Sequence, residues 1–288
     1  MKETSDLIDQ LNRSGKKLSK SQKKIAEYIL QHYDKAVFTT AVSLAEAVGV
    51  SESTVVRFAS ALGYEGYPEL KNALQELVRH RLTAEQRFEM SESINPANVL
   101  PTVLKTDMQN IRNTINQMDC QAFSEAVKRL LSARTIYILG LRSAAPLAQF
   151  FGYYLHFIFE NVCIIAEGSS DVFESISRIR SSDVLVGISF PRYSTRTLEA
   201  MKYARRSGAQ VIGISDGDMS PLCDVSDVSL SARTDMASFV DSLAAPLSLI
   251  NALLVALALE RKDELNAHFK RLEEIWDAHS VYINRETE

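Results

Sequence analysis

The 288-residue sequence contains little cysteine, tryptophan, proline or glycine. It has 3 cysteines, 1 tryptophan, 7 prolines and 11 glycines, and its formal net charge at pH 7 is −4. Low proline and glycine argue against long disordered regions, and the length favours two domains over one. The net charge by itself does not suggest a nucleic-acid binder, but it averages over domains, so local charge matters more.

The cysteines also argue against a disulfide-bonded fold. Cys120, Cys163 and Cys223 are odd in number, far apart and without CxxC spacing. This pattern favours reduced thiols in a cytosolic protein over a disulfide framework or a zinc site. We therefore expect no metal and no cofactor.

The sequence contains no obvious membrane segment. Lys2 and Glu3 open the chain and no apolar stretch follows them, so we expect no signal peptide. Residues 242–259 carry no charge, but they include Pro246 and Asn251 and are rich in alanine. We expect this stretch to form a buried or subunit-interface helix, and the protein to be cytoplasmic with no membrane partner.

The first eighty residues predict five short helices separated by turns. Residues 19–22 and 43–46 both have the Ser-x-x-Gln/Glu spacing of a capping box. Gly49 suits the left-handed position that ends a helix, and Pro68 suits the first turn of another. A weaker helix is expected near residues 7–11.

Residues 43–63 predict a helix, a glycine-containing turn and a second helix with Ser51 as its N-cap. Apolar residues at i, i+3, i+4 and i+7 from Val55 would bury one face of the second helix. Its other face carries small polar residues and Arg57, which suits a helix in the major groove. The expected DNA contacts are Lys20, Ser43, Ser51, Ser53, Thr54, Arg57, Ser60 and Lys71.

A basic cluster accompanies this segment. All charged residues between Asp9 and Glu27 are Lys or Arg, and Lys71 and Arg79 follow later. Such a cluster attracts phosphates in a salt-dependent way. A helix-turn-helix shape also occurs in proteins that never bind DNA, and Arg57 suits a phosphate as well as a base, so both roles stay open for it.

The pattern changes along the chain. We expect a DNA-binding domain at 1–80, a linker at 81–98 and a second domain at 99–288. Short apolar runs in the second domain predict strands at 135–139, 162–166, 183–188, 210–214 and 228–230. Helical stretches between them, including 144–160, 172–180 and 195–207, indicate a parallel sheet covered on both faces. Two helices, 239–260 and 263–282, are expected at the end.

Hydroxyl residues follow three of these predicted strands, at 140–143, 189–195 and 215–221. Helix amino termini present unpaired N–H groups, and ligands of open α/β sheets bind beyond the carboxyl ends of the strands. These segments therefore predict an anion site. The expected effector contacts are Arg142, Ser143, Ser189, Arg192, Ser194 and Thr195. Simple N-capping is the alternative role for each serine, above all for Ser220.

The first domain resembles the N-terminal domain of RpiR-family bacterial regulators. The resemblance spans roughly residues 1–78 and lies in LSKSQKKIA (18–26), VSESTVVRF (50–58) and LGYEGY (62–67). It implies a dimeric binder of palindromic operators with 51–62 as recognition helix. Residues 130–260 resemble the SIS (sugar isomerase) domain, notably in GAQVIGIS (208–215). That resemblance implies a flavodoxin-like five-stranded sheet, phosphosugar binding and dimerisation through helices.

Two loops depart from the SIS pattern. The first usually reads Gly-x-Gly-x-Ser, whereas here Arg142 stands directly before Ser143. The second usually reads Ser-x-Ser-Gly-x-Thr, whereas here Pro191 replaces the second serine, Arg192 the glycine and Ser194 the threonine. The proline removes a hydroxyl and an N–H from the phosphate cradle. The two arginines could restore anion binding, occlude the pocket or favour a carboxylate.

We therefore expect a DNA-binding transcriptional regulator of carbohydrate metabolism, a repressor by the commoner sign of the resembling family. Its partners would be palindromic double-stranded DNA, a small anionic sugar effector, and copies of itself in a homodimer or homotetramer. One alternative is a dimerisation scaffold with a degenerate pocket. Another is a phosphosugar isomerase, whose base would be Glu167, Glu174 or His156. None of these three lies in a signature, and His156 is expected in the core, so we expect no catalytic residue.

Overall fold

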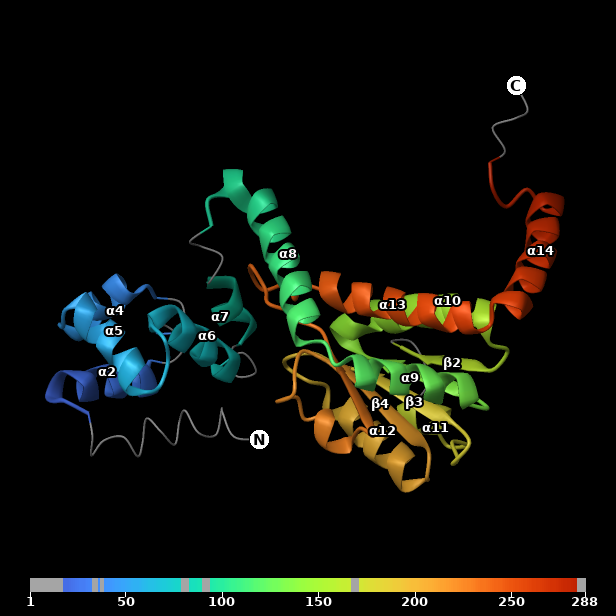
Figure 1. Cartoon of the computed structure of the whole chain (residues 1–288), viewed down its shortest axis with the longest axis horizontal. Helices are drawn as coiled ribbons and strands as arrows, with labels where there is room; N and C mark the ends of the chain where they lie inside the picture. Colours follow the sequence, from blue (N-terminus) through green and yellow to red (C-terminus); the bar gives the residue numbers. More distant parts are fainter. Residues whose placement is uncertain are drawn as a thin grey trace. The chain divides into compact units, whose positions relative to one another are not determined.

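The computed structural model describes residues 18–32, 36, 39–78, 83–89, 94–166 and 171–283. The chain divides into two compact units (Figure 1). The first comprises Met1–Leu100 with Ala237–Val240, and the second comprises Pro101–Met236 with Asp241–Glu288. The first unit is therefore discontinuous in sequence, because four residues from late in the chain belong to it.

The described part of the first unit is helical. Its helices are α2 (Lys20–Gln31), α4 (Ala41–Val48), α5 (Glu52–Ala61), α6 (Tyr67–Val78) and α7 (Ala84–Glu89). The predicted capping box at Ser19 is confirmed, since its hydroxyl accepts the Gln22 N–H and the Gln22 side chain accepts the Ser19 N–H. The helix predicted near residues 7–11 lies outside the described residues.

The start of α4 corrects the second predicted capping box. Thr40, not Ser43, is the N-cap, and its hydroxyl accepts the Ser43 N–H at 3.1 Å. Ala41 and Val42 can both continue a helix, so α4 begins one turn earlier and leaves Ser43 inside its first turn. Gly49 ends the helix at φ 72°, as predicted.

The segment 81–98 contains a helix that the sequence analysis missed. Helix α7 begins after Thr83, whose hydroxyl accepts the Gln86 N–H while the Gln86 side chain accepts the Thr83 N–H. This is a capping box, so a Thr-x-x-Gln signal for the helix was present in the sequence.

The second unit contains the predicted parallel sheet. Its strands are β1 (Ile136–Gly140), β2 (Val162–Ile165), β3 (Val184–Ile188), β4 (Gln210–Ser215) and β5 (Val228–Ser231), in the spatial order β2-β1-β3-β4-β5. All paired strands are parallel. Every residue of β1 and β3 is buried, which explains their continuously apolar sequences. The predicted three-layer α/β fold is confirmed.

Helices cover both faces of this sheet (Figure 1). One face is covered by α9 (Cys120–Ser132), α10 (Ala145–Ile158) and α13 (Ala244–Glu260), and the other by α11 (Val172–Ser175) and α12 (Thr195–Arg206). Helices α8 (Val99–Gln117) and α14 (Lys262–Ala278) extend away from the sheet. Helices α10 and α12 match their predicted ranges closely, but α13 begins at Ala244 and not at residue 239, because residues 239–243 form part of the connection before it. Helix α11 is much shorter than the predicted 172–180, because the chain leaves the helix for turns after Ser175.

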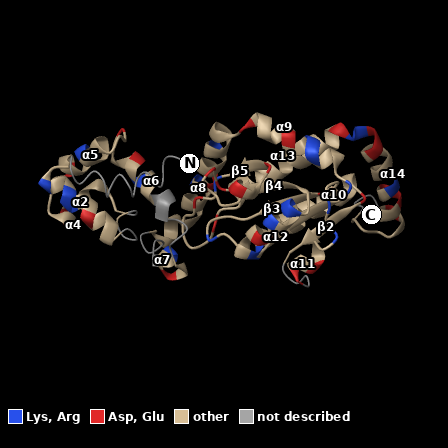
Figure 2. Ribbon diagram, turned by 90° about the horizontal axis from the view of Figure 1, so that it is seen from below, with Lys and Arg blue, Asp and Glu red and all other residues tan. Residues whose placement is uncertain are grey.

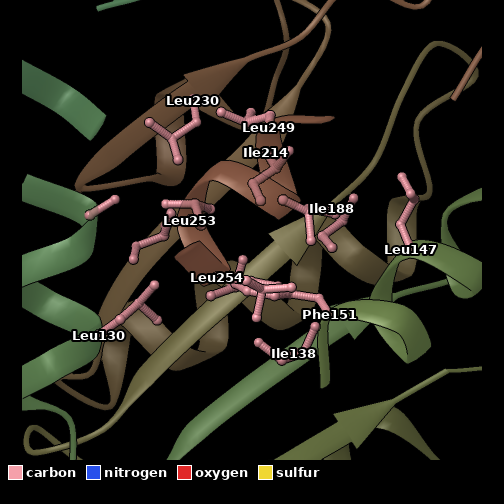
Figure 3. Packing of buried hydrophobic residues seen from close by; sticks show 14 of the residues in the cluster. Leu130, Ile138, Leu147, Phe151, Ile188, Ile214, Leu230, Leu249, Leu253 and Leu254 are labelled. Atoms are coloured by element: carbon pink, nitrogen blue, oxygen red, sulfur yellow. The ribbon is translucent and has the colours of Figure 1, made fainter. Parts of the chain in front are cut away.

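Two apolar cores hold these layers together. One lies between the sheet and helices α9, α10 and α13, with Leu130, Phe151 and Leu253 among its residues (Figure 3). The other lies between the sheet and α12, with Met201 at its centre. Alternate residues of one strand supply opposite cores, as Ile138 and Leu139 of β1 do.

Helix α13 is the charge-free stretch noted in the sequence. One of its faces is buried in the core, as expected, and Val255 and Leu259 on the other face are exposed. In the described residues no single helix meets the length and hydropathy expected of a membrane span. Helices α13 and α14 meet them only as a pair, bent by 99° where they join.

Gly152 allows α10 to lie close to β2, so we expect Gly152→Ala to destabilise the second unit. A β-carbon at this position would overlap the Ile164 side chain. We expect overpacking to lower the free energy of unfolding by about 1–3 kcal/mol, partly offset by the higher helix propensity of alanine, about 1 kcal/mol. Urea unfolding measures the difference.

The matched control is Gly217→Ala, where an added β-carbon meets nothing within 4 Å. Its midpoint should stay near that of the unchanged protein. Equal midpoints for the two variants would contradict the packing argument at Gly152.

Candidate DNA-binding and effector sites

Helices α4 and α5 form the predicted helix-turn-helix. The buried face of α5 is confirmed, because Val55, Phe58 and Ala59 are fully buried and Leu62 nearly so. Ser51 stands at the N-cap, but its hydroxyl makes no cap hydrogen bond. It lies 3.0 Å from the Ser53 hydroxyl and 2.8 Å from that of Thr54. The start of α5 therefore presents a cluster of three hydroxyl groups.

The opposite face of α5 is exposed and carries Ser53, Arg57 and Ser60. Arg57 donates from Nε to the Ser53 carbonyl oxygen at 3.2 Å and from a terminal nitrogen to Ser53 Oγ at 3.4 Å. These bonds orient the guanidinium along the helix. A guanidinium has more N–H donors than they use, so capacity remains for a base or a phosphate.

The other predicted DNA contacts surround this helix unequally. Lys20 and Ser43 are exposed, and lysine positions lie along the ribbon of α2 (Figure 2). Gln22 of α2 donates to the Arg57 carbonyl oxygen at 3.5 Å, so α2 is anchored against the reading helix. Lys71 on α6 is half-buried, and burial lowers the pKa of its ammonium group. It is thus less accessible than Lys20 and Ser43.

One exposed residue of the reading face was missed by the sequence analysis. Val56 keeps 40% of its surface exposed although it is apolar. It follows Ser53 by one helical turn, so spacing alone placed it on the polar face. An exposed methyl group there can contact the C5-methyl of thymine.

The sheet brings the three hydroxyl-bearing loops of the second unit to one edge. Gly140 at the end of β1 pairs with Ile188 of β3, and Ile188 pairs with Ile214 of β4. The segments that follow therefore leave the sheet at the same level. Because β1 and β3 are neighbours while their connections run to opposite sides, this edge holds the topological switch point of a 2-1-3-4-5 sheet.

The serines at this edge already bind backbone groups. The buried Ser189 hydroxyl accepts the Ser194 N–H at 3.0 Å, and the Ser194 hydroxyl caps α12 by accepting the Thr197 N–H at 3.2 Å. The capping role weighed for Ser194 is therefore present. Thr195 and Ser143 are exposed beside the switch point. The Ser189–Ser194 bond holds the loop against the amino end of α12, where N–H groups can attract an anion.

Two arginines in these loops have left-handed backbones. Arg142 has φ 58° and Arg192 has φ 66°, and both side chains are exposed. A left-handed conformation costs a residue with a β-carbon about 1–2 kcal/mol, so surrounding structure must enforce it. Such residues cluster at binding sites. Gly140 adds a tight approach, since a β-carbon there would lie 2.7 Å from the Ala144 carbonyl oxygen.

A buried polar network lies behind these loops, on β4. The Ser215 hydroxyl oxygen lies 2.8 Å from the Ser189 carbonyl oxygen and 2.7 Å from Ser220 Oγ. Tyr193 donates to the buried Asp216 carboxylate at 2.7 Å. Sequence reasoning named neither Tyr193 nor Asp216 as a site residue. The position of Asp216, one residue beyond a buried strand, was the available signal.

Ser220 has a local role. Its hydroxyl accepts the Leu222 N–H at 3.2 Å and so stabilises a turn. The segment after it forms only the 3-10 turn Cys223–Val225.

Of the general bases considered for an isomerase, the structure describes Glu174 and His156. Glu174 is exposed on α11, and Glu167 lies outside the described residues. His156 was expected in the core, but it is exposed. It neighbours the buried Leu155 on α10, and adjacent helical residues point in different directions. It lines a cavity of about 500 Å³ with Ile136, at the opposite, amino end of β1.

Comparison with known proteins agrees with both halves of this description. The model of the rpiR-family helix-turn-helix domain matches residues 5–80, and that of the SIS domain matches residues 129–256. The transcriptional regulator HexR of Pseudomonas aeruginosa is 28% identical over 280 residues, which cover 93% of this chain and 95% of HexR. HexR of Escherichia coli K12 is 24% identical over 278 residues, covering 93% of each chain.

Two solved structures share the fold. The sugar isomerase domain of an RpiR transcription factor from Sphaerobacter thermophilus superposes with a TM-score of 0.59 at 24% identity, covering 62% of this chain and 99% of that one. Vibrio vulnificus NanR, solved in complex with ManNAc-6P, gives 0.58 at 22% identity, covering 97% and 100%.

The two domains occur in the expected order, and the similar full-length proteins are regulators rather than enzymes. The resemblance inferred from the sequence is confirmed. The chain belongs to the RpiR family of helix-turn-helix transcriptional regulators, with a SIS domain as its second domain.

Proposed function

We propose that this regulator represses genes of carbohydrate metabolism and that an anionic sugar, most simply a sugar phosphate, controls its binding to a palindromic operator. The observation that carries the effector site is the pair Arg142 and Arg192, held in left-handed conformations at the switch point between β1 and β3. The NanR structure supports the ligand class, because it contains ManNAc-6P in a protein of the same fold.

The chemistry of the edge suits a charged sugar. Arg142 and Arg192 supply positive charge, and the amino end of α12 with Ser143, Ser189, Ser194 and Thr195 supplies N–H and hydroxyl donors. The buried Asp216 carboxylate accepts a hydrogen bond from Tyr193, so it supports the loop behind these groups.

The DNA-binding half is proposed to be residues 1–80, joined through 81–98 to an effector and dimerisation domain at 99–288. Helix α5 would enter the major groove, with Arg57 and Ser53 toward base edges. The hydroxyls of Ser51, Thr54 and Ser60, together with Lys20, Ser43 and Lys71, would contact the phosphate backbone.

A homodimer or homotetramer completes the proposal. Helix α8 exposes an apolar stripe in which Leu100 is 69% exposed and Met108 and Ile115 are each 63% exposed. Helix α13 exposes Val255 and Leu259. Exposed apolar surface on both helices favours association, and a twofold dimer would present two DNA-binding domains to two half-sites.

Arg57→Ala should weaken operator binding by about 1–3 kcal/mol if the guanidinium contacts a base. The preference at one operator position should also relax. The operator can be obtained by selection from random duplexes with the unchanged protein, and fluorescence anisotropy on single-position variants then measures both effects. A uniform loss would assign Arg57 to a phosphate.

Arg178→Ala, in the second unit, is the matched control for loss of a positive charge. It should bind the operator like the unchanged protein. If Arg57→Ala also binds like the unchanged protein, α5 presents a different face to DNA.

Arg192→Gly separates the two properties of this residue. Glycine adopts φ 66° without strain, so stability should rise by about 1 kcal/mol, while binding of an anionic sugar should weaken by about 1.5–3 kcal/mol through loss of a charged hydrogen bond. Thermal shift and calorimetry with hexose 6-phosphates and 6-phosphogluconate measure both. Arg206→Ala, at the far end of α12, is the control.

Unchanged sugar-phosphate affinity in Arg192→Gly would remove this loop from the site. If no anionic sugar binds the unchanged protein, the second domain acts as a dimerisation scaffold instead.

Met108→Glu should dissociate the oligomer, because it places a charge in the apolar stripe of α8. Sedimentation velocity should show a shift toward monomer. Phe173→Glu is the control, since Phe173 is an exposed apolar residue on α11, on the other side of the sheet. An unchanged sedimentation coefficient for Met108→Glu would place the subunit interface elsewhere.

A further inference from the structure

The connection between β5 and α13 is an extended strap, residues 232–243, that lies along α8 (Figure 1). Its early part is bound to the later turns of α8, where the Arg233 N–H donates to Thr114 Oγ1 at 2.9 Å. Its end is bound nearer the start of the helix, where Ser242 Oγ donates to Asp107 Oδ1 at 2.5 Å. The strap and the helix therefore run antiparallel.

Asn110 fixes the middle of this alignment. Its side-chain amide donates to the Asp235 carbonyl oxygen at 2.8 Å, and its side-chain oxygen accepts the Asp235 N–H at 3.1 Å. The residue is fully buried, although it lies on a helix whose neighbouring positions are largely exposed. Because both backbone groups of one residue are paired by one side chain, sliding the strap along α8 would leave buried polar groups without partners.

The strap begins at the proposed effector edge. The Ala232 N–H donates to the Ser215 carbonyl oxygen at 2.8 Å. Ser215 in turn lies within hydrogen-bond distance of the Ser189 carbonyl oxygen, in the loop that precedes α12. Hydrogen bonds through Ser215 therefore connect that loop to the start of the strap, so a rearrangement of the loop can be transmitted to the strap.

The strap also contributes to the first unit. Ala237–Val240 belongs to that unit, and the rings of Phe239 and Phe88 of α7 pack with centroids 5.9 Å apart. The first two residues of α8 belong to it as well. Two chain segments thus run from the effector domain into the unit that carries the DNA-reading helix, and Asn110 ties them to each other.

We propose that Asn110 is a positioning residue for regulation. It locks the strap to α8, so that a change at the effector edge moves both connections to the DNA-binding domain together. This proposal rests on the effector site proposed above. Asn110 touches neither the operator nor the effector; it determines how strongly one responds to the other.

The test compares the unchanged full-length protein with Asn110→Ala and with Asn116→Ala, an exposed asparagine of the same helix. Operator affinity is measured by anisotropy with and without saturating hexose 6-phosphates or N-acetylmannosamine 6-phosphate. Coupling between sites usually amounts to about 5–150-fold. The unchanged protein and Asn116→Ala should show a shift in this range, and Asn110→Ala should show almost none while still binding each ligand alone.

The reciprocal measurement distinguishes lost coupling from lost binding. Sugar-phosphate affinity should change by the same factor when operator is added to the unchanged protein, and by almost none in Asn110→Ala. A full operator shift in Asn110→Ala would overturn the proposal. Melting temperatures show whether the variant is folded. If it is not, Ser242→Ala, which cuts only the bond to Asp107, should reduce the shift instead.

If no sugar phosphate binds, a double-mutant cycle without ligand still tests the role of Asn110. Operator affinity is measured for Ser215→Ala, Asn110→Ala and the double variant. If the strap transmits changes from the sheet edge, the effect of Ser215→Ala should disappear once Asn110 is replaced. Additive effects of the two substitutions would overturn the role of Asn110, whereas failure of every sugar phosphate to bind overturns only the effector site.

Discussion

The neighbouring parallel pair β1 and β3 is the constraint on which the second domain depends. Their register brings Gly140 level with Ile188, and so aligns the two loops that carry the left-handed arginines. The connections after these strands depart to opposite sides of the sheet, and ligands of open α/β sheets bind at such a point. The location of the candidate site follows from topology, and its side chains determine what the site can bind.

Hydrogen bonds to serine side chains hold the loop after β3 in this arrangement. Ser189 and Ser194 bind backbone N–H groups, and Ser215 lies against the carbonyl oxygen of Ser189. The exposed arginines, together with Ser143 and Thr195, are then available to meet a ligand, on a backbone already fixed by its surroundings. The same division of labour occurs in the first unit, where buried Phe58 positions α5 and exposed Arg57 is available to DNA.

Most of the fold could be predicted, because its strands are continuous apolar runs and several of its helices begin at recognisable caps, as at Ser19 and Ser194. The failures have local causes. Two hydroxyl residues three positions apart were possible N-caps of α4, and the helix begins after Thr40 and not after Ser43. His156 was assigned to the core because its helix is apolar, although its position on that helix faces solvent. Helix α7 is too short to show periodicity, so only its cap could have revealed it.

The site was predicted as a set of residues but not as a geometry. Nothing in the sequence says that Arg142 and Arg192 have positive φ, since that conformation is imposed by contacts distant in sequence. The pairing of Tyr193 with Asp216 joins residues 23 positions apart. Asn110 was overlooked for a related reason: a single polar residue on a helix normally indicates the solvent face, and its partner lies 125 residues away.

The discontinuity of the first unit has a consequence for exchanging domains between such regulators. Ala237–Val240 belongs to the same unit as Met1–Leu100. A DNA-binding domain transferred from one relative to another with a junction at residue 100 would therefore lack its own Phe239, which packs on Phe88 of α7. A functional chimaera must include the strap from the same relative as the DNA-binding domain, or a strap that packs equally well on α7. Recombination between relatives is therefore constrained at a second place in the gene, far from the boundary that the DNA-binding domain alone would suggest.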